Sequence, residues 1–260
     1  MPSDKVFGVD RYELTARLRP AFLALLPAIA LALVWIPAAW TIWGGVIGLL
    51  VTCGVTMMLS RFSRHRGRRV EAKYCDRLGS AVSMMALRHR DELIDPVTKR
   101  RYHEFLQRAG HEIPTITLET ATPGIADTHY RGCVTWLLET TRDTKTYGLI
   151  FEENIDYGFR RNAFGLKVVA VPIAIFCAIG NVAITYATWT GFDATAWKAI
   201  GVGLVCLVAL TMWTFVVNLR FVEDAARSYA VRLLAACDKL KAVRSPKAPR
   251  RRSTLAKVGN

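Results

Sequence analysis

The chain has 260 residues, of which 52% are hydrophobic and 22% are charged, and its formal net charge is +14. The apolar residues gather in runs of about 20, longer than an ordinary core helix requires, and the charges gather between and after these runs. This segregation excludes an ordinary soluble globular protein. It predicts an all-α integral membrane protein.

The first apolar region has no charged residue from position 21 to position 60. It divides into runs at 21–40 and 41–59, and about 20 helical residues match a hydrocarbon core of roughly 30 Å. Pro37 locates the break because proline stops a helix. We therefore expect a transmembrane hairpin over residues 20–60, after a cytosolic segment at 1–19. A second span follows the first almost at once, which argues against a cleaved signal peptide.

The second apolar region contains runs at residues 168–187 and about 199–217. Trp189, Phe192 and Trp197 lie at or near the connection, where aromatic side chains suit a membrane interface. Residues 166–217 are therefore expected to form a second transmembrane hairpin, which gives a 2+2 arrangement of four spans.

Orientation follows from the lysines and arginines next to the spans. Basic residues precede the first and third spans and follow the second and fourth, whereas the two short turns contain one lysine, Lys198. The positive-inside rule then places both termini and the insert at 61–165 in the cytosol. The six cysteines form no CxxC pair, so we expect free thiols in a reducing compartment.

The insert is predicted to be helical. Residues 61–78 continue the second span and residues 80–92 form a further helical stretch. Asp95-Pro96 and Thr122-Pro123 each combine a capping residue with proline at the first helical position. The first helix should end near Gly110 and the second near residue 142.

Three other segments have distinct patterns. Residues 114–122 are rich in β-branched side chains and are expected to form a short extended segment. A helix from about residue 149 is expected to run into the third span, and an amphipathic helix at 218–243 to continue the fourth. Residues 244–260 are basic, contain no acid and are predicted to be disordered.

Signatures of catalysis are not found in the sequence. It contains no GxxxxGK[ST], GxGxxG or HExxH motif, and the histidine spacings match no usual metal site. We therefore predict neither an enzyme nor a bound cofactor or metal.

A charged collar precedes the third span and consists of Glu152, Glu153, Asp156, Arg160 and Arg161. Asp156 and Arg160 are four residues apart, in the order that supports a helix. The collar is interpreted either as ordinary helix pairing at an exposed surface or as the place where a cytosolic signal reaches the membrane part.

A basic segment follows the second span and contains Arg61, Arg64, Arg66, Arg68 and Arg69. Anionic headgroups would attract these cations at about 1 kcal/mol each. A nucleotide signal or a nucleic acid is the alternative ligand, although few aromatic residues interleave with the arginines, as single-strand binding would require.

Small and polar residues also recur within the spans. Gly44, Gly48, Thr52 and Thr56 form a ridge on the second span, and such ridges allow close packing of helices within one chain or between chains. Asn181 and Thr185 share a face of the third span and are candidates for a polar lining. No acidic residue lies within a span, which argues against a proton relay.

Four stretches, at residues 91–106, 136–143, 151–165 and 221–240, resemble an uncharacterised family of bacterial four-span membrane proteins. That resemblance implies a location in the bacterial inner membrane. In layout, the whole chain is similar to four-span membrane effectors of antiphage defence systems.

The functional prediction is a membrane effector or channel-like subunit. It is expected to form a homo-oligomer and to respond to a cytosolic protein or nucleotide signal. The alternative is a membrane-anchored sensor or scaffold that recruits a cytosolic partner and conducts no ions.

Overall fold

The computed structural model describes residues 5–6, 9–75, 77–189, 191 and 194–243. The predicted disorder of residues 244–260 and the aromatic Phe192 lie outside this part of the chain. The structure is almost entirely helical, as predicted, with one small antiparallel pair of strands near the N-terminus, β1 (Lys5–Val6) and β2 (Val9–Asp10).

The first apolar region forms a helical hairpin. The break lies where Pro37 predicts it, and the second helix is capped by Thr41, whose side-chain oxygen accepts a hydrogen bond from Gly44 N at 3.0 Å. This helix continues well beyond the apolar run, as expected. The elements are the π-helix η1 (Glu13–Leu18), α1 (Arg19–Trp35), the 3₁₀-helix η2 (Pro37–Trp40) and α2 (Ile42–Lys73).

The second apolar region forms another hairpin, which begins with the 41-residue helix α7. This helix starts in the charged insert and runs without a break through the third apolar run. The elements are α7 (Gly148–Thr188), α8 (Ala194–Thr211) and the π-helix η3 (Met212–Val216). Within the described residues, four helical segments are long and apolar enough to cross a membrane, and they coincide with the four predicted runs.

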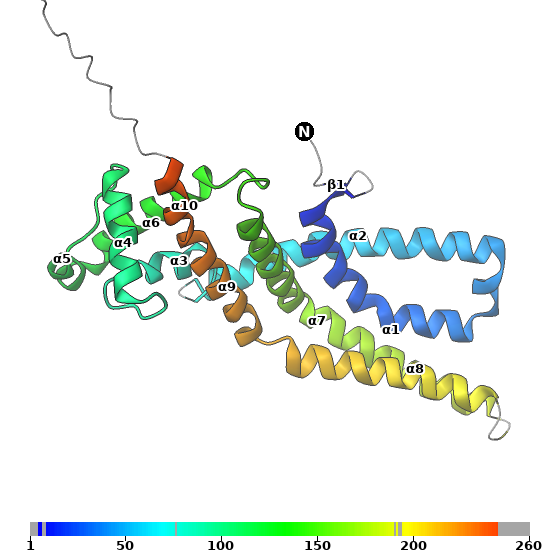
Figure 1. Ribbon diagram of the computed structural model, residues 1–260. Helices are drawn as coiled ribbons and strands as arrows, with labels where there is room; N and C mark the ends of the chain where they lie inside the picture. Colours follow the sequence, from blue (N-terminus) through cyan, green and yellow to red (C-terminus); the bar gives the residue numbers. More distant parts are fainter. Residues whose placement is uncertain (1–4, 7–8, 76, 190, 192–193, 244–260) are drawn as a thin grey trace, which may run out of the picture.

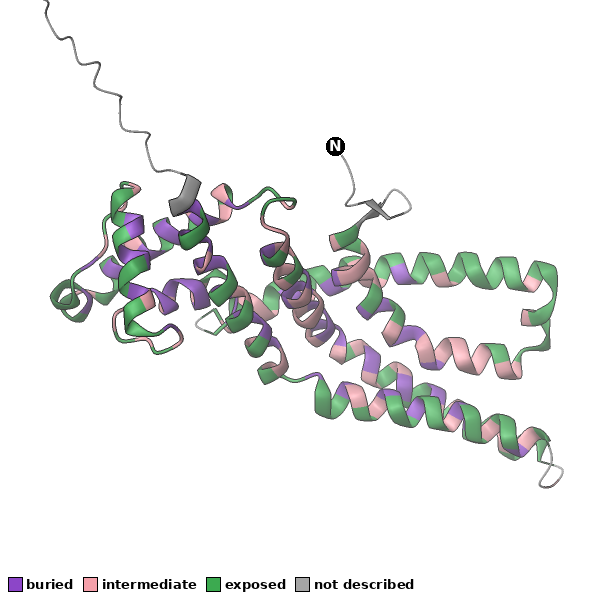
Figure 2. Ribbon diagram, viewed as in Figure 1, coloured by how far each residue is buried: buried purple, intermediate pink, exposed green. Residues whose placement is uncertain are grey.

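The four apolar helices differ greatly in how much of their surface the rest of the chain buries. Helices α1, α7 and α8 pack along one another around a core that includes Leu166, Ala170 and Trp213. The apolar half of α2 extends beside them, and Figure 2 shows it exposed along most of its length. Leu49, for example, is 65% exposed.

A helical domain lies at the opposite end of the molecule from the two hairpin turns (Figure 1). Its helix α4 begins at Pro96 as predicted, because Asp95 caps it by accepting a hydrogen bond from Thr98 N at 2.9 Å. The helices are α3 (Ser80–Ala86), α4 (Pro96–Arg108), α5 (Ile116–Ala121), α6 (Pro123–Thr140), α9 (Leu219–Leu234) and α10 (Ala236–Val243).

The expectation of an extended segment at 114–122 is wrong. Thr115 caps a short helix by accepting from Leu118 N at 3.2 Å, and the buried Glu119 holds that helix against the domain. These tertiary contacts override the weak β-preference of the local sequence. The helix expected at 80–92 is also shorter than predicted, since α3 ends at Ala86.

The fourth apolar helix does not continue into the C-terminal amphipathic helix. The chain turns at Val217, and Asn218 caps α9 by accepting a hydrogen bond from Phe221 N at 3.0 Å. The C-terminal helices instead complete the helical domain, because Leu233, Leu234 and Cys237 are buried in one core with α4 and α6. The segment at 218–243 is therefore part of that domain rather than a separate unit.

Candidate functional site

The apolar hairpins and the helical domain meet at a crossing of α2 and α7. Gly165 lies so close to α2 that a β-carbon there would be 2.8 Å from Gly67 N, and one on Gly67 would be 2.6 Å from Asn162 Oδ1. Ser63 adds a hydrogen bond from its hydroxyl to Asn162 O at 3.1 Å. The helices approach this closely because both present small residues at the contact.

Asn162 also fixes the N-terminal segment on α7. Its amide nitrogen donates to Ala16 O in the π-helix η1 at 2.7 Å, and its side chain is fully buried. Gly158, one turn earlier, leaves room for this segment, since a β-carbon there would be 2.7 Å from the Tyr12 hydroxyl. One polar residue of α7 therefore links η1, α2 and α7.

A second polar residue of α7 fixes the end of the fourth apolar helix. Lys167 Nζ donates to Thr214 O and to Val217 O, both at 2.9 Å. Carbonyls at a helix end have no partner within the helix, and a cation satisfies them favourably. This contact, together with the Asn218 cap, explains why the chain breaks here.

The charged collar is distributed around α7. Asp156 pairs with Arg160 at 2.9 Å, as the spacing of four residues predicts. Arg160 also donates to Phe221 O at 3.2 Å and lies over the Phe221 ring, whereas Glu152 pairs with Arg11 at 2.7 Å.

Arg161 has a different environment from the rest of the collar. It pairs with Glu71 of α2 at 2.5 Å across 90 positions of sequence, and its side chain is 15% exposed. It also lies over the ring of Tyr157. Ordinary helix pairing at an exposed surface, one of the two interpretations of the collar, therefore does not describe Arg161. Glu153 is half-buried on the same helix.

The basic segment presents two separate faces. Arg61, Arg64 and Arg68 line a pocket of about 600 Å³ between α2 and η1. Arg66 and Arg69 line a smaller pocket of about 320 Å³ against α7. The burial of Ser63 and Gly67 at the helix crossing separates the two faces.

An apolar groove adjoins the first of these pockets. It lies between η1, α1, α2 and the start of α7, and its volume is about 790 Å³. Phe22, Leu49 and Thr52 are among its walls, and Leu18 and Met57 line both the groove and the pocket.

The small-residue ridge does not act as one surface. A β-carbon on Gly44 would lie 1.7 Å from Ala38 O, so this glycine, in the first turn of α2, packs against η2. Thr56 is buried and donates to Thr52 O at 2.7 Å, whereas nothing lies within 4 Å of a β-carbon on Gly48. The ridge is thus open at its centre.

The polar residues of the third apolar run are engaged within the chain. Asn181 accepts a hydrogen bond from Trp35 Nε1 and donates one to Ala199 O, both at 2.9 Å. Thr185 donates to Asn181 O at 2.6 Å. Asn181 therefore links α1, α7 and α8.

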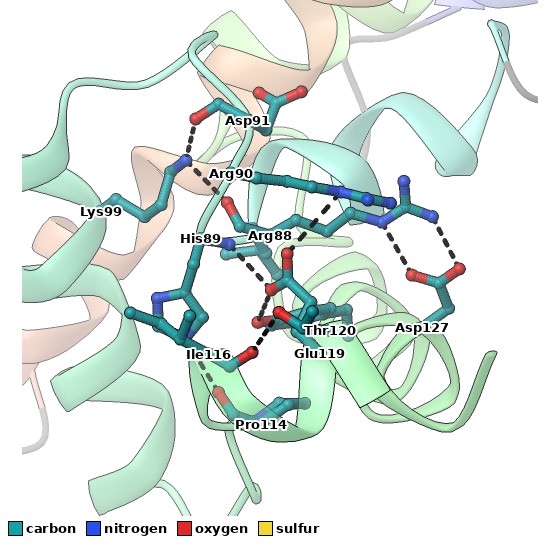
Figure 3. Close-up of polar contacts among 12 residues, drawn as sticks. Arg88, His89, Arg90, Asp91, Lys99, Pro114, Ile116, Glu119, Thr120 and Asp127 are labelled. Carbon is teal, nitrogen blue, oxygen red and sulfur yellow. Dashed lines mark hydrogen bonds and ion pairs between the residues drawn. The ribbon is translucent and has the colours of Figure 1, made fainter. Parts of the chain in front are cut away.

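A buried polar cluster lies within the helical domain (Figure 3). Glu119 accepts hydrogen bonds from His89 N and from the Tyr130 hydroxyl, both at 2.9 Å. Burial opposes its charge, but these hydrogen bonds prevail and hold the pKa of the Glu119 carboxyl below its ordinary value. Arg88 binds Asp127 through two hydrogen bonds of 2.8 and 2.6 Å.

The same cluster fixes the loop after α3. Lys99 is buried and donates to the carbonyls of Arg88 and Asp91 (Figure 3). His103 Nε2 lies 2.7 Å from Leu87 O, so this nitrogen carries the proton. Because these polar groups find partners within the domain, the cluster is best explained as structural. Among the described residues, no three His, Cys, Asp or Glu side chains lie close enough together to hold a metal ion.

Sequence reasoning missed the helix crossing. The spacing Ser63-xxx-Gly67 and the small residues Gly158 and Gly165 were its signal. They lie in charged segments, whereas small-residue spacing is used to predict helix packing within apolar runs. Glu71 as the partner of Arg161 has no local signal at all.

No family model, curated protein or solved structure matches this chain. The resemblance to a four-span bacterial family stays a prediction from the sequence.

Proposed function

We propose that the protein is a multi-pass protein of the bacterial inner membrane, with the helical domain and both termini in the cytosol. Four helices of sufficient length and apolarity support the insertion. The bias of lysine and arginine toward one end of these helices supports the orientation.

We further propose that it acts as a membrane effector or channel-like subunit, which oligomerises and is controlled from the cytosol by a ligand or partner. The observation that carries this proposal is the uncovered apolar half of α2, an extension of the helix that contacts the helical domain (Figure 2). A surface of this kind suits reversible association within a bilayer.

The connection between the two ends supports control from the cytosol. Helices α2 and α7 both run from the apolar region toward the helical domain, and the Gly67–Gly165 contact and the Glu71–Arg161 pair join them near that domain. A shift of one helix there would be transmitted to the other. The proposed coupling requires two discrete arrangements of this crossing.

A membrane-anchored sensor or scaffold is the second candidate. The engagement of Asn181 by Trp35 and Ala199 favours it, because this polar group is used for packing instead of lining a water-filled path. In that case the helical domain would recruit a cytosolic partner and no ions would cross.

Expression of the full chain in bacteria separates the two functions. The effector function predicts growth arrest with uptake of a membrane-impermeant dye, and phage infection is the first trigger to apply because of the shared layout. The scaffold function predicts that a soluble partner protein copurifies with the chain in fixed ratio, and that the cells take up no dye with or without phage infection. Dye exclusion both with and without infection would contradict the effector proposal.

A further inference from the structure

One side of α2 changes from apolar to cationic along a continuous surface. Leu49 and Thr52 line the apolar groove, and Arg61 and Arg64 follow on the same side of the helix in the basic pocket. The two hollows share Met57 of α2, and they also share Leu18 of η1. Together they form one elongated site, with an apolar part toward the hairpin turn and a basic part toward the helical domain.

The basic part has an excess of positive charge. Of the residues that the structure describes, four arginines, at positions 17, 61, 64 and 68, line it together with one acid, Glu13, which pairs with Arg17. Among the described residues, no hydrogen bond or ion pair engages the guanidinium groups of Arg61, Arg64 and Arg68. Guanidinium groups bind phosphate oxygens with paired hydrogen bonds, so this pocket suits a phosphate.

The acids at the groove are already neutralised. Glu152 and Asp156 contribute to its wall, but Glu152 pairs with Arg11 at 2.7 Å and Asp156 with Arg160 at 2.9 Å. The groove volume of about 790 Å³ lies within the usual range of roughly 300–1,000 Å³ for ligand sites.

We infer that this site binds one anionic phospholipid, with an acyl chain in the groove and the phosphate between Arg61 and Arg64. The inference rests on the proposed membrane insertion, and it names the ligand of one face of the basic segment. An anionic lipid complements both parts of the site. A second copy of this chain complements only the apolar part, because the arginine-rich end of its α2 would repel the arginines of the basic part.

Native mass spectrometry of the full chain in a non-ionic detergent tests the inference. Phosphatidylglycerol and phosphatidylcholine of identical acyl chains are added in separate titrations. We expect one tightly retained phosphatidylglycerol per chain and clearly weaker retention of phosphatidylcholine. Equal retention of both lipids would overturn the inference.

Charge variants locate the headgroup. Arg61→Gln with Arg64→Gln should weaken phosphatidylglycerol binding by about tenfold or more, given the contribution of each cation near an anionic lipid. The matched control is Arg66→Gln with Arg69→Gln, which removes the same charge from the other face of α2 and should leave most of the binding. An equal loss in both variants would mean nonspecific attraction and would overturn the site.

Bulky substitutions locate the acyl chain. Thr52→Trp should fill the groove and reduce lipid retention, whereas Val51→Trp, on an exposed neighbouring position outside the groove, should not. If Thr52→Trp does not fold, Cys53→Phe at the groove wall replaces it. Unchanged retention in a folded groove variant, or crosslinking of Cys53 between two chains that excludes lipid, would overturn the inference.

Failure of this inference is distinguishable from failure of the proposed function. Resistance of the protein to extraction from membranes by alkaline carbonate reports insertion, and it does not depend on any bound lipid. A protein that resists extraction but shows no lipid preference would contradict the lipid site alone.

Discussion

Gly165 of α7 packs against the backbone of Gly67 of α2, so that a β-carbon on Gly165 would lie 2.8 Å from the Gly67 nitrogen. This contact lies next to the buried Asn162 and the Glu71–Arg161 pair. This close approach of α2 to α7 is thus in the charged region, where the helical domain begins, and not within the apolar run of α2.

Substitution of Gly165 by alanine is predicted to destabilise the protein by about 1–3 kcal/mol, because backbone atoms cannot move aside as a flexible side chain would. Thermal unfolding in detergent, followed by tryptophan fluorescence, should show a Tm lower by several degrees. Gly132→Ala on α6 is the control, since nothing lies within 4 Å of its β-carbon. That variant should unfold at or above the wild-type Tm.

Removal of either partner of the Glu71–Arg161 pair is predicted to cost about 2 kcal/mol, because the other charge would be left half-buried without its partner. Glu71→Gln, Arg161→Met and the double variant form a double-mutant cycle, measured by unfolding in detergent. The exposed pair Glu104–Arg108 serves as control and should contribute about 0–1 kcal/mol. Additive effects of the two single changes would show that the pair is not coupled.

The helical domain is predicted to lose stability as the pH falls below about 6.5. Burial, reinforced by the neighbouring His89 and Lys99, lowers the pKa of His103 despite its hydrogen bond to Leu87 O. As the pH falls, the unfolded chain therefore takes up a proton at this position before the folded chain does. The free energy of unfolding rises with pH between the lowered pKa of His103 in the folded chain and its ordinary value of about 6.5.

Unfolding between pH 5 and pH 7 measures this effect. His103→Gln keeps a donor for Leu87 O and should reduce the pH dependence, whereas His65→Gln, at an exposed position of α2, should not. The carboxyl of Glu119 contributes at lower pH, because its pKa is held below the ordinary value. An unchanged pH dependence in the His103 variant would contradict the assignment.

The proposed topology predicts the outcome of reporter fusions. Fusions near Asp10, Gln107 and Lys257 should report the cytosol, and fusions near Trp40 and Gly191 should report the external side. The reason is the consistent bias of basic residues toward one end of the four apolar helices. An external signal at Gln107 would contradict the 2+2 model.

Self-association is predicted to depend on the open part of the small-residue ridge. Gly48→Leu should weaken an oligomer detected by crosslinking in membranes, because a bulky side chain separates closely packed helices. The fold of one chain should tolerate it, since nothing lies within 4 Å of this position. Gly54→Leu is the matched control, because it is equally open but lies about 120° around the helix. If both variants form the same oligomer, the face of α2 that contains Gly48 does not mediate self-association.

Local pattern alone determined the four apolar helices, the break at Pro37 and the start of α4 at Asp95-Pro96. Transfer of apolar residues from water and helix capping act over a few neighbouring residues, so a linear sequence shows them directly. The Asp156–Arg160 pair was predictable for the same reason.

Only the tertiary structure decided which helices meet and which charges pair. The Gly67–Gly165 crossing orients α2, and this orientation divides the arginines at 61–69 between two pockets and brings Glu71 to Arg161 across 90 positions. The helix at Ile116–Ala121 depends likewise on the buried contacts of Glu119. Such contacts arise from side chains far apart in the sequence, whose distances are set by packing of the whole chain.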